Sequence, residues 1–123
     1  MGHFILIVDD DAVTREALTH IFTRAGYLVA ASDGGQDLGA TMANLHFQAA
    51  VVDYHLPGTT GLVVARRLKE LQPWCKVLII SAEFPLEAWE AAGANEADAF
   101  LTKPFSKDTI LAELAKLVAA GQT

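Results

Sequence analysis

The chain has 123 residues, the length of one ordinary domain, and 52% of them are hydrophobic, which is enough for a buried core. Acidic residues outnumber basic ones, 15 to 9, and the net charge of −6 argues against direct binding to the phosphate backbone of nucleic acid. The longest apolar runs, such as residues 4–8, are far shorter than the ~20 residues that cross a membrane, and Met1-Gly2-His3 does not open a signal peptide. We therefore expect a single cytoplasmic domain over residues 1–123, without membrane contact.

In chain order, short apolar runs alternate with segments of helical periodicity. The first run, FILIV, and four later ones are rich in β-forming residues, which is typical of strands buried on both faces. The predicted strands are 4–8, 28–31, 49–52, 77–80 and 99–101. Between and after them, helices are predicted over 13–25, 36–44, 64–71, 85–92 and 110–118, with Gly26 ending the first and Ser106 capping the last.

This alternation of strand and helix predicts the fold class. Strands that each lead into a helix form a parallel sheet with helices on both faces, a doubly wound α/β fold. In such folds the functional crevice lies beyond the carboxyl ends of the strands. The side chains at those ends are carboxylates after the first and third strands, a hydroxyl after the fourth and an amine after the fifth: Asp9, Asp10, Asp53, Ser81 and Lys103.

These five side chains predict a site for phosphoryl transfer. Carboxylates ~4 Å apart repel each other by about 4 kcal/mol at an effective dielectric constant near 20, so a cluster of Asp9, Asp10 and Asp53 needs compensation. Lys103 offsets part of the repulsion, and Mg²⁺, which takes one or two carboxylates plus a phosphate oxygen, offsets the rest. Asp53 stands alone on a central strand and is the predicted nucleophile toward phosphorus, while Ser81 donates to a phosphoryl oxygen.

The charged residues among them also have a purely structural interpretation. An acidic turn at 9–11 can cap the following helix, because carboxylates are favourable near a helix N-terminus, and we expect this role for Asp11. Asp53 can be an ordinary aspartate at a strand end, Lys103 a surface lysine and Pro104 a helix breaker. The functional interpretation is favoured because all the residues fall at strand ends that meet at one edge of the sheet.

Four sequence fragments occur in order at the predicted strand ends. They are Asp9-Asp10; Asp53-Tyr54-His55-Leu56-Pro57 followed by Gly61; Ser81-Ala82; and Lys103-Pro104-Phe105. Together they resemble the receiver domain of bacterial two-component response regulators, over about residues 4–119. The resemblance implies a flavodoxin-like sheet with strand order 2-1-3-4-5.

The resemblance implies a role for each residue of the site. Asp53 accepts a phosphoryl group from a phosphohistidine on a histidine kinase or a histidine phosphotransfer protein. Asp10, Asp53 and the backbone carbonyl of His55 bind Mg²⁺, and Asp9 acts through a bound water. Lys103 pairs with Asp53 and later with the phosphoryl group.

The resemblance also implies how the signal leaves the site. On activation Ser81 moves toward the phosphoryl group and Phe100 turns inward behind it. This movement couples the site to the face formed by the fourth helix, the fifth strand and the last helix, where a downstream protein binds. His55 and Glu83, at the mouth of the site, tune the rate of dephosphorylation.

The sequence departs from the family pattern ahead of the fifth strand. Glu96 stands where the family often has glycine, and Gly93 comes three residues earlier. We therefore expect the fourth helix to be shortened or shifted. The pattern is kept further on, where the peptide bond between Lys103 and Pro104 is implied to be cis.

Two other functions remain open at this point. Residues 9–13 also fit the opening of haloacid dehalogenase-like phosphohydrolases, with Asp9 as the nucleophile, but no acidic pair follows Lys103 to complete that metal site. A receiver-like docking module that is never phosphorylated would have no use for mutually repelling carboxylates. We expect a phosphoacceptor domain that catalyses only its own phosphorylation and dephosphorylation, and not an enzyme acting on other substrates.

Overall fold

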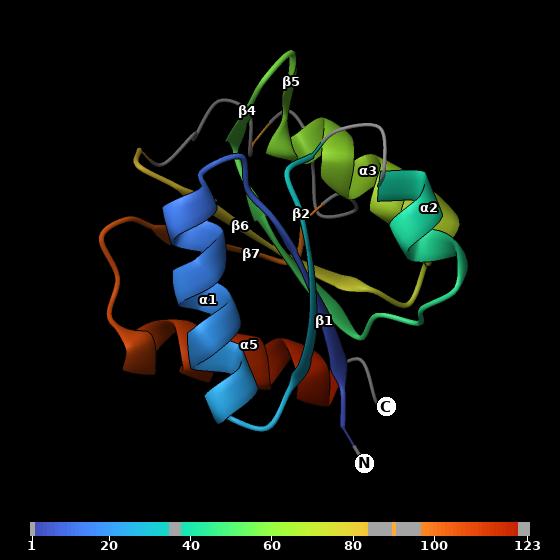
Figure 1. Cartoon of the computed structure of the whole chain (residues 1–123). Helices are drawn as coiled ribbons and strands as arrows, with labels where there is room; N and C mark the ends of the chain where they lie inside the picture. The colour runs from blue at the N-terminus through green and yellow to red at the C-terminus, as the bar shows by residue number, and fades with distance from the viewer. Residues whose placement is uncertain (1, 35–37, 84–89, 91–96, 121–123) are drawn as a thin grey trace.

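The core of the structure is a five-stranded parallel sheet. The computed structural model describes residues 2–34, 38–83, 90 and 97–120. The strands lie in the order β2-β1-β3-β6-β7 (Figure 1), which is the predicted order 2-1-3-4-5. Their bounds are β1 Phe4–Val8, β2 Leu28–Ser32, β3 Ala49–Asp53, β6 Lys76–Ser81 and β7 Ala99–Thr102. The predicted fold class is confirmed.

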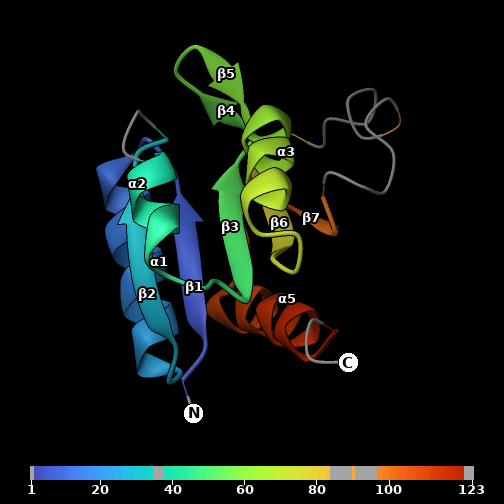
Figure 2. The ribbon, with the colours of Figure 1, turned by 90° about the vertical axis from the view of Figure 1, so that its right-hand side faces the viewer.

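Helices cover both faces of the sheet because alternate strand residues point to opposite sides. Ile5 and Ile7 pack in a cluster with residues of α1 (Ala12–Arg24) and α5 (Lys107–Ala120). Leu6 and Val8 pack in a second cluster with residues of α2 (Leu38–Ala43) and α3 (Gly61–Leu71). The two pairs of helices accordingly lie on opposite faces (Figures 1 and 2).

Helix ends follow the predicted capping residues. Asp11 is the N-cap of α1, and its side chain accepts a hydrogen bond from the Val13 amide. Gly26, with φ of 100°, follows the end of this helix, where a residue with a side chain would be strained. Ser106 precedes α5, and its hydroxyl oxygen accepts a hydrogen bond from the Thr109 amide at 3.0 Å.

A small hairpin after β3 was not predicted. It pairs β4 (His55–Leu56) with β5 (Thr59–Thr60) through a Pro57-Gly58 turn, and its strands are too short to show a periodic sequence signal. The predicted helix over 85–92 and the expected shift near Glu96 fall outside the described residues. No helix in the described part of the chain is long and apolar enough to span a membrane.

Candidate functional site

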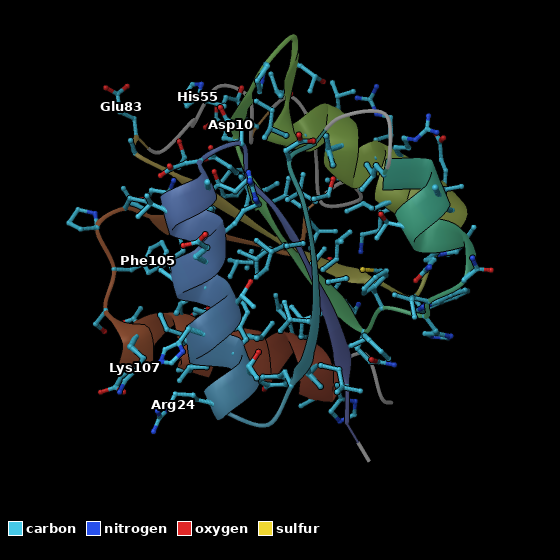
Figure 3. All side chains as sticks on the ribbon, viewed as in Figure 1. Asp10, Arg24, His55, Glu83, Phe105 and Lys107 are labelled. Atoms are coloured by element: carbon cyan, nitrogen blue, oxygen red, sulfur yellow. The ribbon has the colours of Figure 1, made fainter. Side chains whose placement is uncertain are left out.

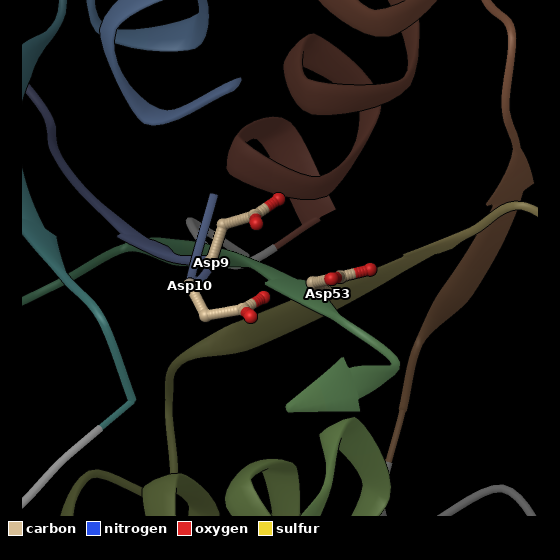
Figure 4. A group of neighbouring side chains, drawn as sticks. All are labelled: Asp9, Asp10 and Asp53. Atoms are coloured by element: carbon tan, nitrogen blue, oxygen red, sulfur yellow. The ribbon is translucent and has the colours of Figure 1, made fainter. Parts of the chain in front are cut away.

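The sheet brings three carboxylates together at the carboxyl ends of its strands. Asp9 directly follows β1, and Asp53 is the last residue of the neighbouring strand β3, in a register that pairs Val8 with Val52. One carboxylate oxygen from each of Asp9, Asp10 and Asp53 lies within 4.8 Å of the others (Figure 4). The acidic cluster expected from the strand ends is therefore formed.

Lys103 supplies a positive charge to this cluster. Its Nζ lies 3.5 Å from Oδ1 of Asp53 and 3.7 Å from Oδ2 of Asp9. The backbone amide of Lys103 donates to the carbonyl of Ser81 at 2.7 Å, which extends the β6–β7 pairing and holds the lysine over the strand ends. The Lys103–Pro104 peptide bond is cis.

The environment of Asp9 fits a bound cation. Its side chain is fully buried; Oδ1 accepts a hydrogen bond from the Asp11 amide, whereas Oδ2 has no hydrogen-bond donor among the described residues. Burial raises the pKa of this carboxyl, helped by the negative charges of Asp53 and Asp10, while the Asp11 amide and Lys103 act in the opposite direction. A buried oxygen without a donor, next to two further carboxylates, is suited to hold a hard divalent cation or one of its water ligands.

Ser81 lies beside the acidic cluster at the end of β6. It is buried and directly follows Ile80, the residue that pairs with Asp53 in the β3–β6 register. Its hydroxyl oxygen accepts a hydrogen bond from the Glu83 amide at 3.3 Å. Ser81 therefore lies at the same edge of the sheet as Asp53, at the end of the adjacent strand.

His55 and Glu83 lie at the mouth of the site. Both are exposed, and Figure 3 shows them with Asp10 at one end of the molecule. The His55 ring makes an edge contact with Tyr54, with 4.9 Å between the ring centroids. A cleft of about 370 Å³, lined by Asp10, Asp33, Gly34 and Pro57, opens at this end.

Phe100 lies further from the carboxylates, in the middle of β7. It pairs with Ile79 in the β6–β7 register and packs, partly buried, against the apolar cluster on the α2–α3 side of the sheet. The structure thus places Phe100 two residues before the end of its strand, behind the site and not in it.

Arg15 contributes to the site but was not identified from the sequence. Its Nη1 donates a hydrogen bond to the backbone carbonyl of Asp9 at 2.7 Å, which fixes the turn that carries Asp9 and Asp10. The sequence gives only a weak indication of this contact. It is the presence of one basic residue near the start of the helix that follows the acidic turn.

Comparison with known proteins identifies the family. Residues 5–115 match the response regulator receiver domain. The chain belongs to the response regulator receiver domain family. The transcriptional regulatory protein TcrA of Mycobacterium tuberculosis is 32% identical to this receiver domain over 120 residues, which cover 98% of the chain and 47% of TcrA.

Solved structures agree with this assignment. A CheY-like receiver domain protein from Methanospirillum hungatei superposes with a TM-score of 0.88 and 26% identity, covering 99% of this chain and 98% of that one. A response regulator from Burkholderia pseudomallei, solved with a phosphorylated aspartic acid, a calcium ion and citrate, has a TM-score of 0.84 and 26% identity, covering 98% and 71%.

Family membership supports the first of the functions considered from the sequence. As a receiver domain, the chain is a phosphoacceptor signalling switch of the two-component type, and receiver domains are phosphorylated by histidine kinases and pass the signal to effectors. Nothing in the comparisons supports a haloacid dehalogenase-like phosphohydrolase. The chain spans 16% of the sensory protein RpfC of Xanthomonas campestris and about half of TcrA, so it corresponds to one part of these longer relatives.

Proposed function

We propose that Asp53 accepts the phosphoryl group, from a phosphohistidine on a histidine kinase or a histidine phosphotransfer protein. The observation that carries this proposal is the position of the Asp53 carboxylate, 3.5 Å from the Lys103 ammonium and within 4.8 Å of two further carboxylates at the carboxyl edge of the sheet. The Lys103 ammonium, together with a divalent cation held by the other carboxylates, would stabilise the negative charge of a phosphoryl group.

The transfer forms one bond and breaks one. An Asp53 carboxylate oxygen bonds to phosphorus, the bond between phosphorus and the donor imidazole nitrogen breaks, and its electron pair stays on that nitrogen. The Lys103 ammonium then shifts from pairing with a free carboxylate to pairing with a phosphoryl oxygen. The Ser81 hydroxyl, on the neighbouring strand, donates to another phosphoryl oxygen.

Mg²⁺ is the cofactor that fits this donor set. We assign Asp10, Asp53 and the backbone carbonyl of His55 as its ligands, with Asp9 acting through a water. When bound, Mg²⁺ neutralises charge on the phosphoryl oxygens during transfer. The assignment is supported by the buried Oδ2 of Asp9, which accepts no hydrogen bond from the described residues, and by the repulsion among the three carboxylates.

Adding Mg²⁺ is therefore expected to raise the melting temperature. A free concentration ~10 times the dissociation constant stabilises the folded state by about 1.4 kcal/mol, which corresponds to about 5 °C for a domain of this size. Thermal melting followed by circular dichroism, with and without EDTA, measures the shift. Asp10→Asn is the control: it should lose most of the shift while melting at the same or a higher temperature without metal. An unchanged melting temperature across the millimolar range of Mg²⁺ would argue against the site.

The remaining residues of the predicted site are assigned to the conformational change and to the control of dephosphorylation. Ser81 and Phe100 are proposed to move on phosphorylation, passing the change to β7 and α5, where a downstream protein binds. The exposed side chains of His55 and Glu83 are proposed to set the rate of dephosphorylation. In this proposal the domain catalyses only its own phosphorylation and dephosphorylation, and it contacts neither nucleic acid nor membrane.

The direct test uses a small phosphodonor in place of the partner protein. Incubation with acetyl phosphate and Mg²⁺ should add one phosphoryl group to the chain, measured by intact mass spectrometry. EDTA should prevent the addition, because the carboxylates then lack the cation. A chain whose mass stays unchanged with acetyl phosphate and with phosphoramidate would contradict the proposed function.

A further inference from the structure

Exposed apolar side chains concentrate along α3. Among the described residues, five large hydrophobic side chains are exposed, and three of them lie on α3 or in the turn that follows it. These are Val63, Leu71 and Trp74, which are 51%, 46% and 44% exposed. A cluster of this kind on one element is typical of a binding surface, whereas single exposed hydrophobic residues are ordinary.

A groove runs beside Val63, between α3, α2 and the β4–β5 hairpin. It has a volume of about 500 Å³ and is lined by Leu38, Gly39, Pro57, Thr59, Val63 and Arg67, among others. Figure 2 looks at the side of the molecule that carries both helices. We call this feature the α2–α3 groove. Its mainly apolar walls can accommodate side chains of a partner.

The charge on α3 is positive, whereas the net charge of the whole chain is negative. The net charge is −6, yet α3 contains three basic residues and one acidic residue. Lys69 is neutralised by Asp98 at 2.7 Å, whereas Arg67 has no acidic partner in the described parts of the chain. None of the described residues that line the groove is acidic, and an Arg67 Nη atom lies 3.4 Å from where a Cβ on Gly39 would be. The groove therefore presents a guanidinium among apolar groups.

The spacing of the surface residues matches a helical ligand. Val63, Arg67 and Leu71 are four residues apart, which places them about 6 Å apart along one side of α3. A partner helix repeats its side chains at the same interval, so apolar and acidic residues one turn apart would meet Val63 and Arg67 together.

We propose that the α2–α3 groove binds an acidic amphipathic helix of a partner protein. Apolar side chains of that helix pack between Leu38 and Val63, and a neighbouring carboxylate pairs with Arg67. This surface borders the cleft at the phosphoacceptor site, with which it shares Gly34 and Pro57, but none of its lining residues is assigned to phosphoryl transfer or to the β7–α5 face, so the proposal goes beyond the proposed function. It is tested on the unphosphorylated chain, independently of phosphoryl transfer.

The test compares two fluorescein-labelled helical peptides by fluorescence anisotropy. Both carry the same leucines, flanked by glutamates in one peptide and by lysines in the other. The acidic peptide should bind about tenfold more tightly than the basic one. The net charge of −6 alone would favour the basic peptide, so this order distinguishes groove binding from general attraction.

Exposed residues allow variants that keep the fold. Arg67→Glu should weaken binding of the acidic peptide by about tenfold and reverse the preference, and Val63→Ser should weaken both peptides. Arg24→Glu is the matched control, since Arg24 lies at the end of α1 on the other side of the sheet (Figure 3), and it should change neither.

Three results would overturn the proposal. The first is equal or preferential binding of the basic peptide. The second is binding that Arg67→Glu and Arg24→Glu weaken equally. The third is self-association of the chain in sedimentation that Val63→Ser abolishes, which would assign the groove to a second copy.

Discussion

Replacing Asp53 with asparagine is expected to abolish phosphoryl transfer to this chain. The carboxamide has the same shape, but it lacks the anionic oxygen that attacks phosphorus and can no longer pair with Lys103 as a charge. The fold should persist, because removing one of three carboxylates within 4.8 Å relieves repulsion. Intact mass spectrometry after incubation with acetyl phosphate and Mg²⁺ should show one added phosphoryl group on the wild type and none on Asp53→Asn.

Asp9→Asn is the matched control for this substitution. It removes a carboxylate from the same cluster but keeps the acceptor, so phosphorylation should become slower and still occur. The opposite pattern, in which Asp53→Asn is phosphorylated and Asp9→Asn is not, would make Asp9 the nucleophile. Circular dichroism of both variants should match the wild type, so that a loss of activity is not a loss of fold.

Substituting Gly61 with alanine is expected to destabilise the domain and disturb the acceptor together. A Cβ at this position would lie 2.6 Å from the Asp53 carbonyl oxygen and 2.9 Å from the Tyr54 Cα, which are backbone atoms that cannot rotate away. The Gly61 amide also donates to the Tyr54 carbonyl at 2.7 Å, which holds the start of α3 against the end of β3. We expect a loss of about 3 kcal/mol and a melting temperature lower by about 12 °C.

Gly39→Ala provides the comparison for this effect. A Cβ on Gly39 makes only an ordinary contact with the flexible Arg67 side chain, and alanine within α2 lowers the entropy of the unfolded chain. This variant should melt at the same or a slightly higher temperature. Urea unfolding gives the free energies, and the rate of acetyl phosphate uptake should fall only in Gly61→Ala. Equal stability of the two variants would show that α3 can move away from Asp53 at little cost.

The strands and the acidic cluster could be predicted because their signals are local. Continuous apolar runs mark strands buried on both faces, and the alternation with helices requires a parallel sheet. Once the sheet is parallel, every strand ends at the same edge, so Asp9, Asp53 and Lys103 were expected at one edge despite their separation in the chain.

Other features of the site depend on side-chain directions and could not be predicted. Asp9 and Asp10 are adjacent in the sequence, yet the first is fully buried and the second exposed, because the turn after β1 points them to different sides. The hydrogen bond from Arg15 to the Asp9 carbonyl depends on how α1 packs on the sheet. The close approach of Gly61 to Asp53 depends on where α3 begins.

The sequence by itself determined the order of elements, the fold class and the residues at the strand ends, since each follows from hydrophobic periodicity and from the rules of parallel sheets. Only the tertiary structure decided the distances from Lys103 to Asp9 and Asp53, the lack of a hydrogen bond to Oδ2 of Asp9 from the described residues, and the α2–α3 groove. These depend on the packing of side chains from elements far apart in the chain, and no local pattern encodes that packing.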